Sequence, residues 1–306
     1  MVTGGAGFIA SHLVEALVEA GLNVTVVDNF ITGSAENLKA VNKKINVIVG
    51  DLGDLLRLNR LNVADYMYIF HLAANPYIPP SVENPAYDLY QNLQNTFALL
   101  EALRKATQRP RLINASSAAV YGNPARLPIR ETDPTVPISP YGVSKLAAER
   151  YVAVYSQLYD IPAISMRFFS VYGPRQRKQV VFDILRKLHA NPREIEILGD
   201  GSQARDFAFV DDVVQAMLLG AKKAPGKGET YNVASGTTYT IKDLVNLWCE
   251  ICGVAPEIKY TGHVRPGDAE RWEVDLSKLQ TLDYRPQTCL EEGLRSVRAW
   301  YDNVPK

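Results

Sequence analysis

Short apolar segments alternate with amphipathic segments along the first half of the chain. Each apolar segment is bounded by turn or polar residues, as buried strands are, and apolar residues recur at helical spacing between them. The predicted strands are Val24–Asp28, Asn46–Asp51, Tyr66–His71, Arg111–Ser116 and Ala163–Phe168, and the predicted helices are Phe8–Ala20, Ala86–Ala106 and Tyr141–Tyr159. Strands that alternate with helices predict βαβ units, and therefore an α/β fold with a doubly wound parallel sheet.

The pattern loosens after about residue 170. Prolines separate short helices and loops there, and one strand-like segment occurs at Thr230–Ala234. We expect a smaller α/β C-terminal lobe that closes over the carboxyl edge of the sheet, where open α/β sheets bind ligands. The predicted division gives residues 1–169, with a return segment at about 206–235, to the sheet domain, and residues 170–205 and 236–306 to the lobe.

The composition indicates a globular protein without a strong overall charge. Of the 306 residues, 47% are hydrophobic, which is enough for a large core. Lys and Arg (33) balance Asp and Glu (33), so no net charge attracts nucleic acid or an anionic membrane. No apolar run reaches the ~20 residues of a membrane span, and we expect no signal peptide. Three cysteines are too few for a disulfide scaffold, so a cytoplasmic protein is expected. The cysteines and histidines also lack the spacing of metal ligands.

A glycine-rich turn follows the short first strand. Gly5, Gly7 and Ala10 satisfy the spacing G-x-G-x-x-G/A at the start of the first predicted helix. Small residues there let a pyrophosphate approach the amides at the positive end of a helix, as in a Rossmann-type dinucleotide-binding fold. A helix-capping turn is the structural alternative, but the strand before and the helix after the turn favour the dinucleotide site.

Acidic residues end the next two predicted strands. Asp28 is placed to accept hydrogen bonds from a ribose and to repel a 2′-phosphate, so NAD is favoured over NADP. Asp51 and Leu52 follow the third strand and are expected beside the adenine. A solvated turn is the alternative for Asp51.

A serine, a tyrosine and a lysine form the candidate catalytic set. Tyr141 and Lys145 are four residues apart and share one face of a predicted helix. A free tyrosine has a pKa near ~10, but a nearby Lys⁺ and a cationic nicotinamide favour the phenolate, which makes it a usable base. Ser117 follows the Arg111–Ser116 strand, where it could hydrogen-bond the same substrate hydroxyl. An ordinary amphipathic helix is the alternative for the Tyr–Lys pair.

Several motifs in order resemble one family. They are Val2–Ile9, Val27–Asn29, Gly50–Leu52, His71–Ala74, Ser116–Gly122, Ser139–Lys145, Arg167–Pro174, Leu198–Asp206 and Arg265–Asp268. Together they resemble the extended short-chain dehydrogenases/reductases, and within them the nucleotide-sugar 4-epimerases of the UDP-galactose 4-epimerase type. The resemblance covers essentially the whole chain. It implies a Rossmann domain that binds NAD tightly, a lobe that binds a UDP-sugar, and inversion of C4 through a 4-keto sugar.

The resemblance also implies residue roles. The residues expected to hold NAD are Gly4, Gly7, Phe8, Ile9, Asp28, Asn29, Asp51, Leu52, Leu72, Ala73, Ala74, Asn92, Ser116, Tyr141, Lys145 and Phe168. Ser117 and Tyr141 would carry the proton chemistry, and Lys145 would bridge the nicotinamide ribose. Arg205 and Arg265 would bind the diphosphate, a task that suits guanidinium groups, and Asp268 would accept a hydrogen bond from the uridine or its ribose.

Neighbouring positions narrow the reaction. Sugar-nucleotide dehydratases of this family carry an Asp-Glu pair after the serine, and the related decarboxylases usually keep a Glu there. Here the residues are Ala118 and Ala119, which cannot move protons. A net dehydrogenase with exchangeable NAD and a non-catalytic NAD-binding protein are the rival classes. The intact catalytic set argues against the second.

Three positions bear on the sugar. Trp272 aligns with the family site whose bulk limits N-acetyl sugars, which favours UDP-glucose and UDP-galactose. Ser170 replaces the usual Asn of the 4-epimerases, and the run that ends at Arg177 resembles UDP-glucuronate 4-epimerases, in which that arginine meets the sugar carboxylate. UDP-glucuronate 4-epimerase is therefore the alternative. The helices 87–103 and 141–159 are apolar on more than one face, so a homodimer through two helices per subunit is expected.

Overall fold

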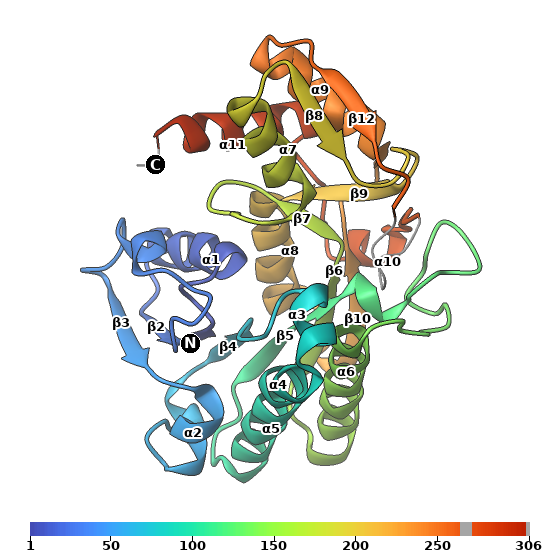
Figure 1. Cartoon of the computed structure of the whole chain (residues 1–306). Helices are drawn as coiled ribbons and strands as arrows, with labels where there is room; N and C mark the ends of the chain where they lie inside the picture. The colour runs from blue at the N-terminus through green and yellow to red at the C-terminus, as the bar shows by residue number, and fades with distance from the viewer. Residues whose placement is uncertain (264–270, 304–306) are drawn as a thin grey trace.

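A seven-stranded parallel sheet forms the centre of the molecule (Figure 1). The structure is a computed structural model that describes residues 1–263 and 271–303. The strands run in the order β10-β6-β5-β4-β1-β2-β3, so the chain starts near the middle and winds toward both edges. Their bounds are β1 Val2–Thr3, β2 Val24–Asp28, β3 Ile45–Val49, β4 Tyr68–His71, β5 Arg111–Ser117, β6 Ala163–Phe168 and β10 Lys227–Val233. This is the doubly wound Rossmann-type arrangement that the alternating pattern predicts.

Helices cover both faces of the sheet. Successive strand residues point to opposite faces, so Phe70 and Ile113 belong to one core while Ile69 and Leu112 belong to the other. The first face packs against α1 Phe8–Glu19 and α8 Val210–Lys223, and the second against α2 Leu52–Arg57, α5 Asn95–Lys105 and α6 Pro140–Tyr159. Short turns of 3₁₀-helix lie at Ala35–Leu38, Val63–Asp65 and Ala118–Val120. None of the described helices is long and apolar enough to cross a membrane.

The first strand is short but central. Its two residues pair on both sides, with Val2 beside Val26 of β2 and Phe70 of β4. Thr3 is fully buried and leads directly into the glycine turn. The strand therefore lies inside the sheet, between β4 and β2, although it has only two residues.

The predicted helix over Ala86–Ala106 is confirmed, and it contains a π-turn. It runs without a break through α4 Pro85–Leu89, the π-helical turn Tyr90–Gln94 and α5, and the short helix α3 Ile78–Glu83 precedes it. Proline at its first position and the Asn84 side chain, which accepts a hydrogen bond from the Tyr87 amide, start α4. The wide π-turn occurs where polar Gln91 and Asn92 are buried, and π-turns inside helices are frequent at functional sites.

The second half of the chain adds a smaller α/β lobe above the carboxyl edge of the sheet (Figure 1). It contains a three-stranded sheet in the order β11-β9-β7 and a two-stranded sheet, β12-β8. The strands are β7 Ser170–Tyr172, β8 Glu194–Ile197, β9 Ala204–Phe209, β11 Thr238–Thr240 and β12 Glu257–Tyr260, and the helices are α7 Gln179–Ala190, α9 Ile241–Cys252, α10 Ser277–Gln280 and α11 Leu290–Asn303. Fully buried Trp248 of α9 donates from its indole to the Val181 carbonyl at 3.0 Å, which fixes the start of α7.

Candidate active site

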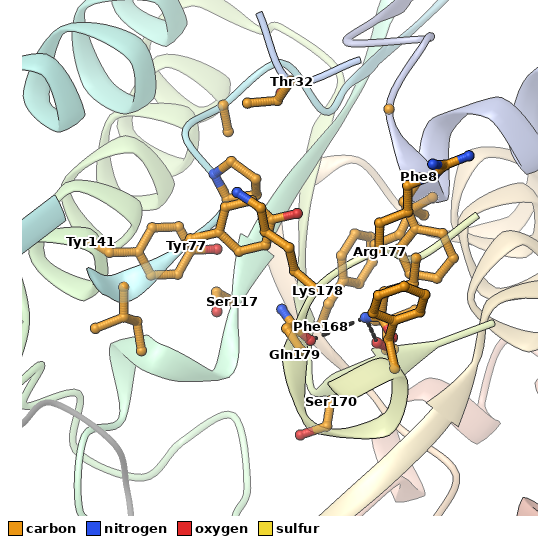
Figure 2. A pocket seen from close by; sticks show the side chains of 18 of the residues that line it. Phe8, Thr32, Tyr77, Ser117, Tyr141, Phe168, Ser170, Arg177, Lys178 and Gln179 are labelled. Atoms are coloured by element: carbon orange, nitrogen blue, oxygen red, sulfur yellow. Dashed lines mark hydrogen bonds between the residues drawn. The ribbon is translucent and has the colours of Figure 1, made fainter. Parts of the chain in front are cut away.

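A cavity of about 1080 Å³ lies between the carboxyl edge of the sheet and the lobe. Figure 2 shows part of its wall, with Tyr141 and Ser117 on one side and the segment Arg177–Gln179 on the other. The NAD candidates that line it are Gly4, Gly7, Phe8, Ile9, Asp28, Asn29, Asp51, Leu52, Leu72, Ala73, Ala74, Ser116, Tyr141, Lys145 and Phe168, and the substrate candidates are Ser117, Ser170, Arg177, Arg205 and Trp272. The fold therefore brings nearly all the predicted site residues to one cavity.

Three candidates stand apart. Asn92 is buried and bonds to Asn75 and Asp88, and it does not line the cavity. Its contact with NAD stays a prediction. Arg265 and Asp268 lie outside the described residues.

The glycine turn brings the backbone before α1 close to the backbone of Ala73. Gly4 has φ +68°, and a Cβ there would lie 2.7 Å from the backbone nitrogen of Ala73, so only glycine fits. The first turn of α1 has no acidic residue, and its N-cap Gly7 makes no side-chain capping bond. The helix therefore presents open amides and a positive dipole end to the cavity, as a pyrophosphate requires.

Asp28, at the end of β2, holds the glycine turn in place through hydrogen bonds. Its two carboxylate oxygens accept hydrogen bonds from the amides of Ala6 at 2.9 Å and Phe30 at 2.7 Å. A carboxylate oxygen can accept more than one hydrogen bond, so both oxygens retain capacity for the ribose hydroxyls. Asp28 thus shapes the turn and faces the cavity at the position expected for the adenosine ribose.

Asp51 has a structural role besides the predicted one. It is the N-cap of α2, and it accepts hydrogen bonds from the amide of Gly53 at 3.0 Å and from the side chains of Tyr90, Gln91 and Asn95 at 3.2–3.3 Å. These bonds join α2 to the π-turn and to α5. The polar pocket at the adenine end is therefore built by residues from three elements.

The candidate catalytic set meets at the end of β5. Ser117 is the last residue of the strand, and Tyr141 and Lys145 lie on the first turns of α6, whose N-cap is Ser139. The Ser117 hydroxyl lies near enough to the phenol of Tyr141 to lower its pKa. The Lys145 ammonium donates to the carbonyl of Ala115 at 3.0 Å. Strand end and helix face thus bring together the three side chains that their sequence positions predict.

Burial sets the electrostatics of this set. Burial raises the pKa of Tyr141 to about 12, the nearby Ser117 hydroxyl opposes the rise, and the Asp88 carboxylate adds to it. Burial lowers the pKa of Lys145 to about 8, and Asp88 opposes that fall. The phenol therefore needs added positive charge before it can act as a base at neutral pH. A bound cationic nicotinamide is a source of such charge.

His71 is a structural residue, as its place in the predicted strand suggests. Its Nδ1 lies 2.8 Å from the Thr3 hydroxyl, and its Nε2 lies 2.9 Å from the Thr96 hydroxyl, which donates to the Asn92 carbonyl. This arrangement corresponds to a neutral ring with its proton on Nε2. Burial, with the nearby Lys145 charge, lowers the pKa of His71 to about 3, so the ring is not a base candidate.

A buried ion pair holds α6, the helix that carries Tyr141 and Lys145, against β5 and β6. Glu149 of α6 accepts two hydrogen bonds from Arg167 of β6 and one from Ser116 of β5 at 2.9 Å. Both partners of the ion pair are at most 3% exposed. Arg167 also donates to Tyr121 Oη at 2.6 Å. These bonds fix the helix that carries Tyr141 and Lys145 against the two strands beneath it.

Two aromatic side chains, one after β6 and one from the lobe, line the cavity together. Trp272 packs edge-to-face on Phe169 with ring centroids 5.8 Å apart, and the Arg205 guanidinium lies 5.0 Å from the indole ring centre. Backbone contacts hold Trp272 in place: its amide donates to the Ala204 carbonyl at 3.1 Å. Nearby, Ile129 bridges to Val274, so the loop after Ser117 reaches the same segment.

The segment after β7 crosses from the lobe to the dinucleotide side. Arg175 has φ +74°, and its guanidinium contacts both carboxylate oxygens of Glu15 on α1 at 2.6 and 2.7 Å. Two residues on, Arg177 lies with its guanidinium 5.8 Å from the Trp300 ring centre, and Lys178 lies with its ammonium 4.6 Å from the Tyr77 ring centre. Figure 2 shows Tyr77 between Lys178 and Tyr141.

The sequence interpretation missed Tyr77, Lys178 and Asp88. Tyr77 and Lys178 are 101 residues apart and meet only in the folded chain, so no local pattern indicates the pair. Asp88 lies inside a segment with helical spacing, where an acidic residue is usually a solvated one. Its burial, at 1% exposed, could not be seen from that spacing.

A glycine turn, an acidic residue at the end of β2 and a Ser-Tyr-Lys set on one parallel sheet define an NAD-binding enzyme of the short-chain dehydrogenase/reductase class. The model of the NAD dependent epimerase/dehydratase family matches residues 1–234, and the chain belongs to this family. A putative UDP-glucose 4-epimerase of Methanocaldococcus jannaschii is 35% identical over 99% of this chain and 98% of its own.

Solved structures agree with this class. The UDP-glucose 4-epimerase of Thermotoga maritima, solved with UDP-glucose, has a TM-score of 0.90 and 35% identity, over 98% of this chain and 97% of its own. The UDP-glucuronic acid 4-epimerase of Bacillus cereus, solved with UDP-glucuronic acid and NAD, has a TM-score of 0.89 and 30% identity, over 98% of both chains. The chain is an enzyme of the NAD-dependent UDP-sugar 4-epimerase family.

The residues present fit NAD. A Cβ at Gly4 would occupy the space where the turn approaches Ala73, and the open amides at the start of α1 face the same cavity. Asp28, Asp51 and Lys145 provide polar groups along one wall. Among the described residues, no group of three or more His, Cys, Asp or Glu side chains could hold a metal ion.

Proposed function

We propose that this enzyme inverts C4 of UDP-hexoses and interconverts UDP-galactose and UDP-glucose. The observation that carries the proposal is the Ser117–Tyr141–Lys145 set, in which two alanines directly follow Ser117. Ala118 is fully buried and Ala119 is 5% exposed, so the residues after Ser117 offer no group that could protonate a leaving hydroxyl or assist loss of carbon dioxide. Oxidation and return of hydride at one carbon need no such group.

The chain's own residues supply positioning and proton transfer. When bound, NAD would supply the hydride acceptor and donor for C4. Tyr141 Oη would take the C4 hydroxyl proton and later return it, and the Ser117 hydroxyl would hydrogen-bond the same oxygen. Lys145, four residues along the same helix, would hold the nicotinamide ribose and would add positive charge near the phenol. That charge favours the phenolate and so opposes the effect of burial on the Tyr141 pKa.

We also propose how the ligands divide between the two halves. Residues 1–169, with the return segment at about 206–235, would hold NAD. Residues 170–205 and 236–306 would hold the nucleotide sugar, with Arg205 and Arg265 at the diphosphate and Asp268 at the uridine or its ribose. Trp272, held between Phe169 and Arg205, would limit the space for an N-acetyl group, which supports glucose and galactose.

UDP-glucuronate is the second candidate substrate. Ser170 and exposed Arg177 line the cavity, and no described ion pair joins Arg177 to an acidic residue, so its charge is available to a carboxylate. A neutral hexose has no use for that charge. The Bacillus cereus relative, solved with UDP-glucuronic acid, covers the chain as fully as the Thermotoga relative does.

A product assay tests the function and separates the two substrates. Purified protein without added NAD is offered UDP-galactose, UDP-glucose and UDP-glucuronate separately, and the sugars are resolved by chromatography. We expect interconversion of the first two, and an Arg177→Ala variant to keep that activity. Turnover of UDP-glucuronate alone, lost in Arg177→Ala, would contradict the proposed substrate. Activity that depends on added NAD would indicate a net dehydrogenase instead.

A homodimer is the proposed assembly. Exposed apolar side chains gather on α5 and α6, and they include Phe97 (40% exposed), Tyr151 (43%), Val154 (47%) and Leu158 (67%). The rings of Phe97 and Tyr151 pack edge-to-face at 5.5 Å, so the two helices present one surface. A second copy would cover it in a two-fold four-helix interface.

Charges on this surface are expected to separate the subunits. We expect the wild type to have about twice the chain mass of 33.9 kDa in solution, and Val154→Asp combined with Leu158→Asp to reduce it to one chain mass. Light scattering after size exclusion measures both. The control is Leu22→Asp, at a 51% exposed leucine just after α1, which should leave the mass unchanged. A monomeric wild type at micromolar concentration would contradict the proposal.

A further inference from the structure

The carboxylate of Asp88 is buried against α6, the helix that carries Tyr141 and Lys145. It lies in α4 and is 1% exposed. One oxygen accepts a hydrogen bond from the Ser144 hydroxyl at 2.7 Å, and the other accepts from the side-chain amides of Asn75 and Asn92, both at 2.9 Å. All three partners donate, and acceptance by both oxygens is the pattern of an ionised carboxylate. Burial of such a group is costly unless it is fully hydrogen-bonded, as it is here.

The three donors come from the elements that build the site. Ser144 lies between Tyr141 and Lys145 on α6. Asn75 follows Leu72, Ala73 and Ala74, which line the cavity, and its amide donates to Asn92 Oδ1 at 2.8 Å. Asn92 belongs to the π-turn between α4 and α5. One carboxylate thus joins the catalytic helix, the loop after β4 and the π-turn.

The charge of Asp88 faces the catalytic pair. The titratable groups that the charge reaches are Tyr141 and Lys145 on α6, and hydrogen bonds through Asn92 and Thr96 link Asp88 to His71 at the end of β4. His71 stays neutral at working pH because burial and the Lys145 charge lower its pKa to about 3. The negative charge of Asp88 raises the pKa of Tyr141 and of Lys145. It therefore keeps the buried lysine protonated, at the cost of a less acidic phenol.

We propose that Asp88 is a positioning residue for the reaction: it fixes the catalytic helix against the loop after β4 and supplies the counter-charge that keeps Lys145 cationic. The proposal rests on the proposed function, because it assigns Lys145 its role in the epimerase reaction. Ser144 transmits the positional part through its hydrogen bond. The charge acts directly through space and does not need Ser144.

The test compares pH profiles of kcat/KM for the holoenzyme and its variants, on a UDP-sugar that the wild type turns over. Asp88→Asn removes the charge, so the pKa values of Tyr141 and Lys145 should both fall. The rising limb, set by the phenol, and the falling limb, set by the ammonium, should then move to lower pH together, on the order of 1 pH unit. Tyrosinate absorbance of the holoprotein, taken as the difference from Tyr141→Phe, should show the same movement of the Tyr141 midpoint.

Two further variants separate charge from structure. Ser144→Ala removes the hydrogen bond and keeps the charge, and Asp88→Glu keeps the charge and displaces it. Both should lower kcat and leave the limbs in place. Unmoved limbs in Asp88→Asn, or moved limbs in Asp88→Glu, would overturn the proposal, and the second result can be obtained even where Asp88→Asn fails to fold. A wild type inactive on every UDP-sugar would instead contradict the proposed function.

Discussion

Replacement of Tyr141 by phenylalanine is expected to lower kcat by about 10²–10⁴-fold, the range that one positioned acid–base group supplies. The phenol lies near the Ser117 hydroxyl, and it is the group proposed to move the C4 proton. Phenylalanine keeps the ring and its packing, so the variant should remain folded and retain NAD. Turnover is measured with UDP-galactose, and retained NAD by its absorbance after denaturation.

Tyr77→Phe is the matched control for this prediction. Tyr77 lines the same cavity as Tyr141, and Lys178 contacts its ring (Figure 2). The control should therefore keep kcat within about tenfold of the wild type. If Tyr141→Phe also keeps kcat within tenfold, Tyr141 is not the proton-transfer group, and the assignment of the base is wrong.

Replacement of Arg167 by methionine is expected to lower the free energy of unfolding by about 3–5 kcal/mol. The substitution leaves Glu149 as a buried carboxylate without its guanidinium partner, in a position only 3% exposed. Tyr121 would also lose the donor that lies 2.6 Å from its hydroxyl. Urea denaturation followed by circular dichroism measures the change.

An exposed ion pair provides the comparison for Arg167. Arg186 pairs with Asp183 at 2.9 Å on α7, and its side chain is 56% exposed. Water screens such a pair, so Arg186→Met should change the free energy of unfolding by no more than about 1 kcal/mol. Equal effects of the two substitutions would show that burial of the Arg167–Glu149 pair adds nothing to stability.

The strands could be predicted from the sequence because their apolar residues form short, uninterrupted segments. Val24–Asp28 and Ala163–Phe168 match β2 and β6, and Thr230–Ala234 overlaps β10. The helix 86–106 could also be predicted, but its π-turn could not, since helical spacing continues through it. Polar side chains of the π-turn are bound there by Asp88 of the same helix and by Asp51, which comes from a distant part of the chain.

The same distinction holds for the site. The residues that line the NAD half of the cavity lie at the ends of strands or at the starts of helices. The fold class alone therefore places Gly4, Asp28 and Ser117 at the carboxyl edge of the sheet. Asn92 was expected at NAD and lies behind the wall, because the π-turn directs it toward Asn75. The contact between Lys178 and Tyr77 depends on how the lobe packs on the sheet domain. The periodicity of the sequence does not show this packing.

Two contacts described above cross from the dinucleotide side of the cavity to the lobe: Arg175 to Glu15 of α1, and Lys178 to Tyr77. Together they join the two walls of the cavity at two places. In the proposed reaction the cofactor is oxidised and reduced in place within one cycle. An enzyme that keeps its cofactor in this way works independently of the ratio of free NAD to NADH around it, and its direction follows only the relative amounts of the two sugars.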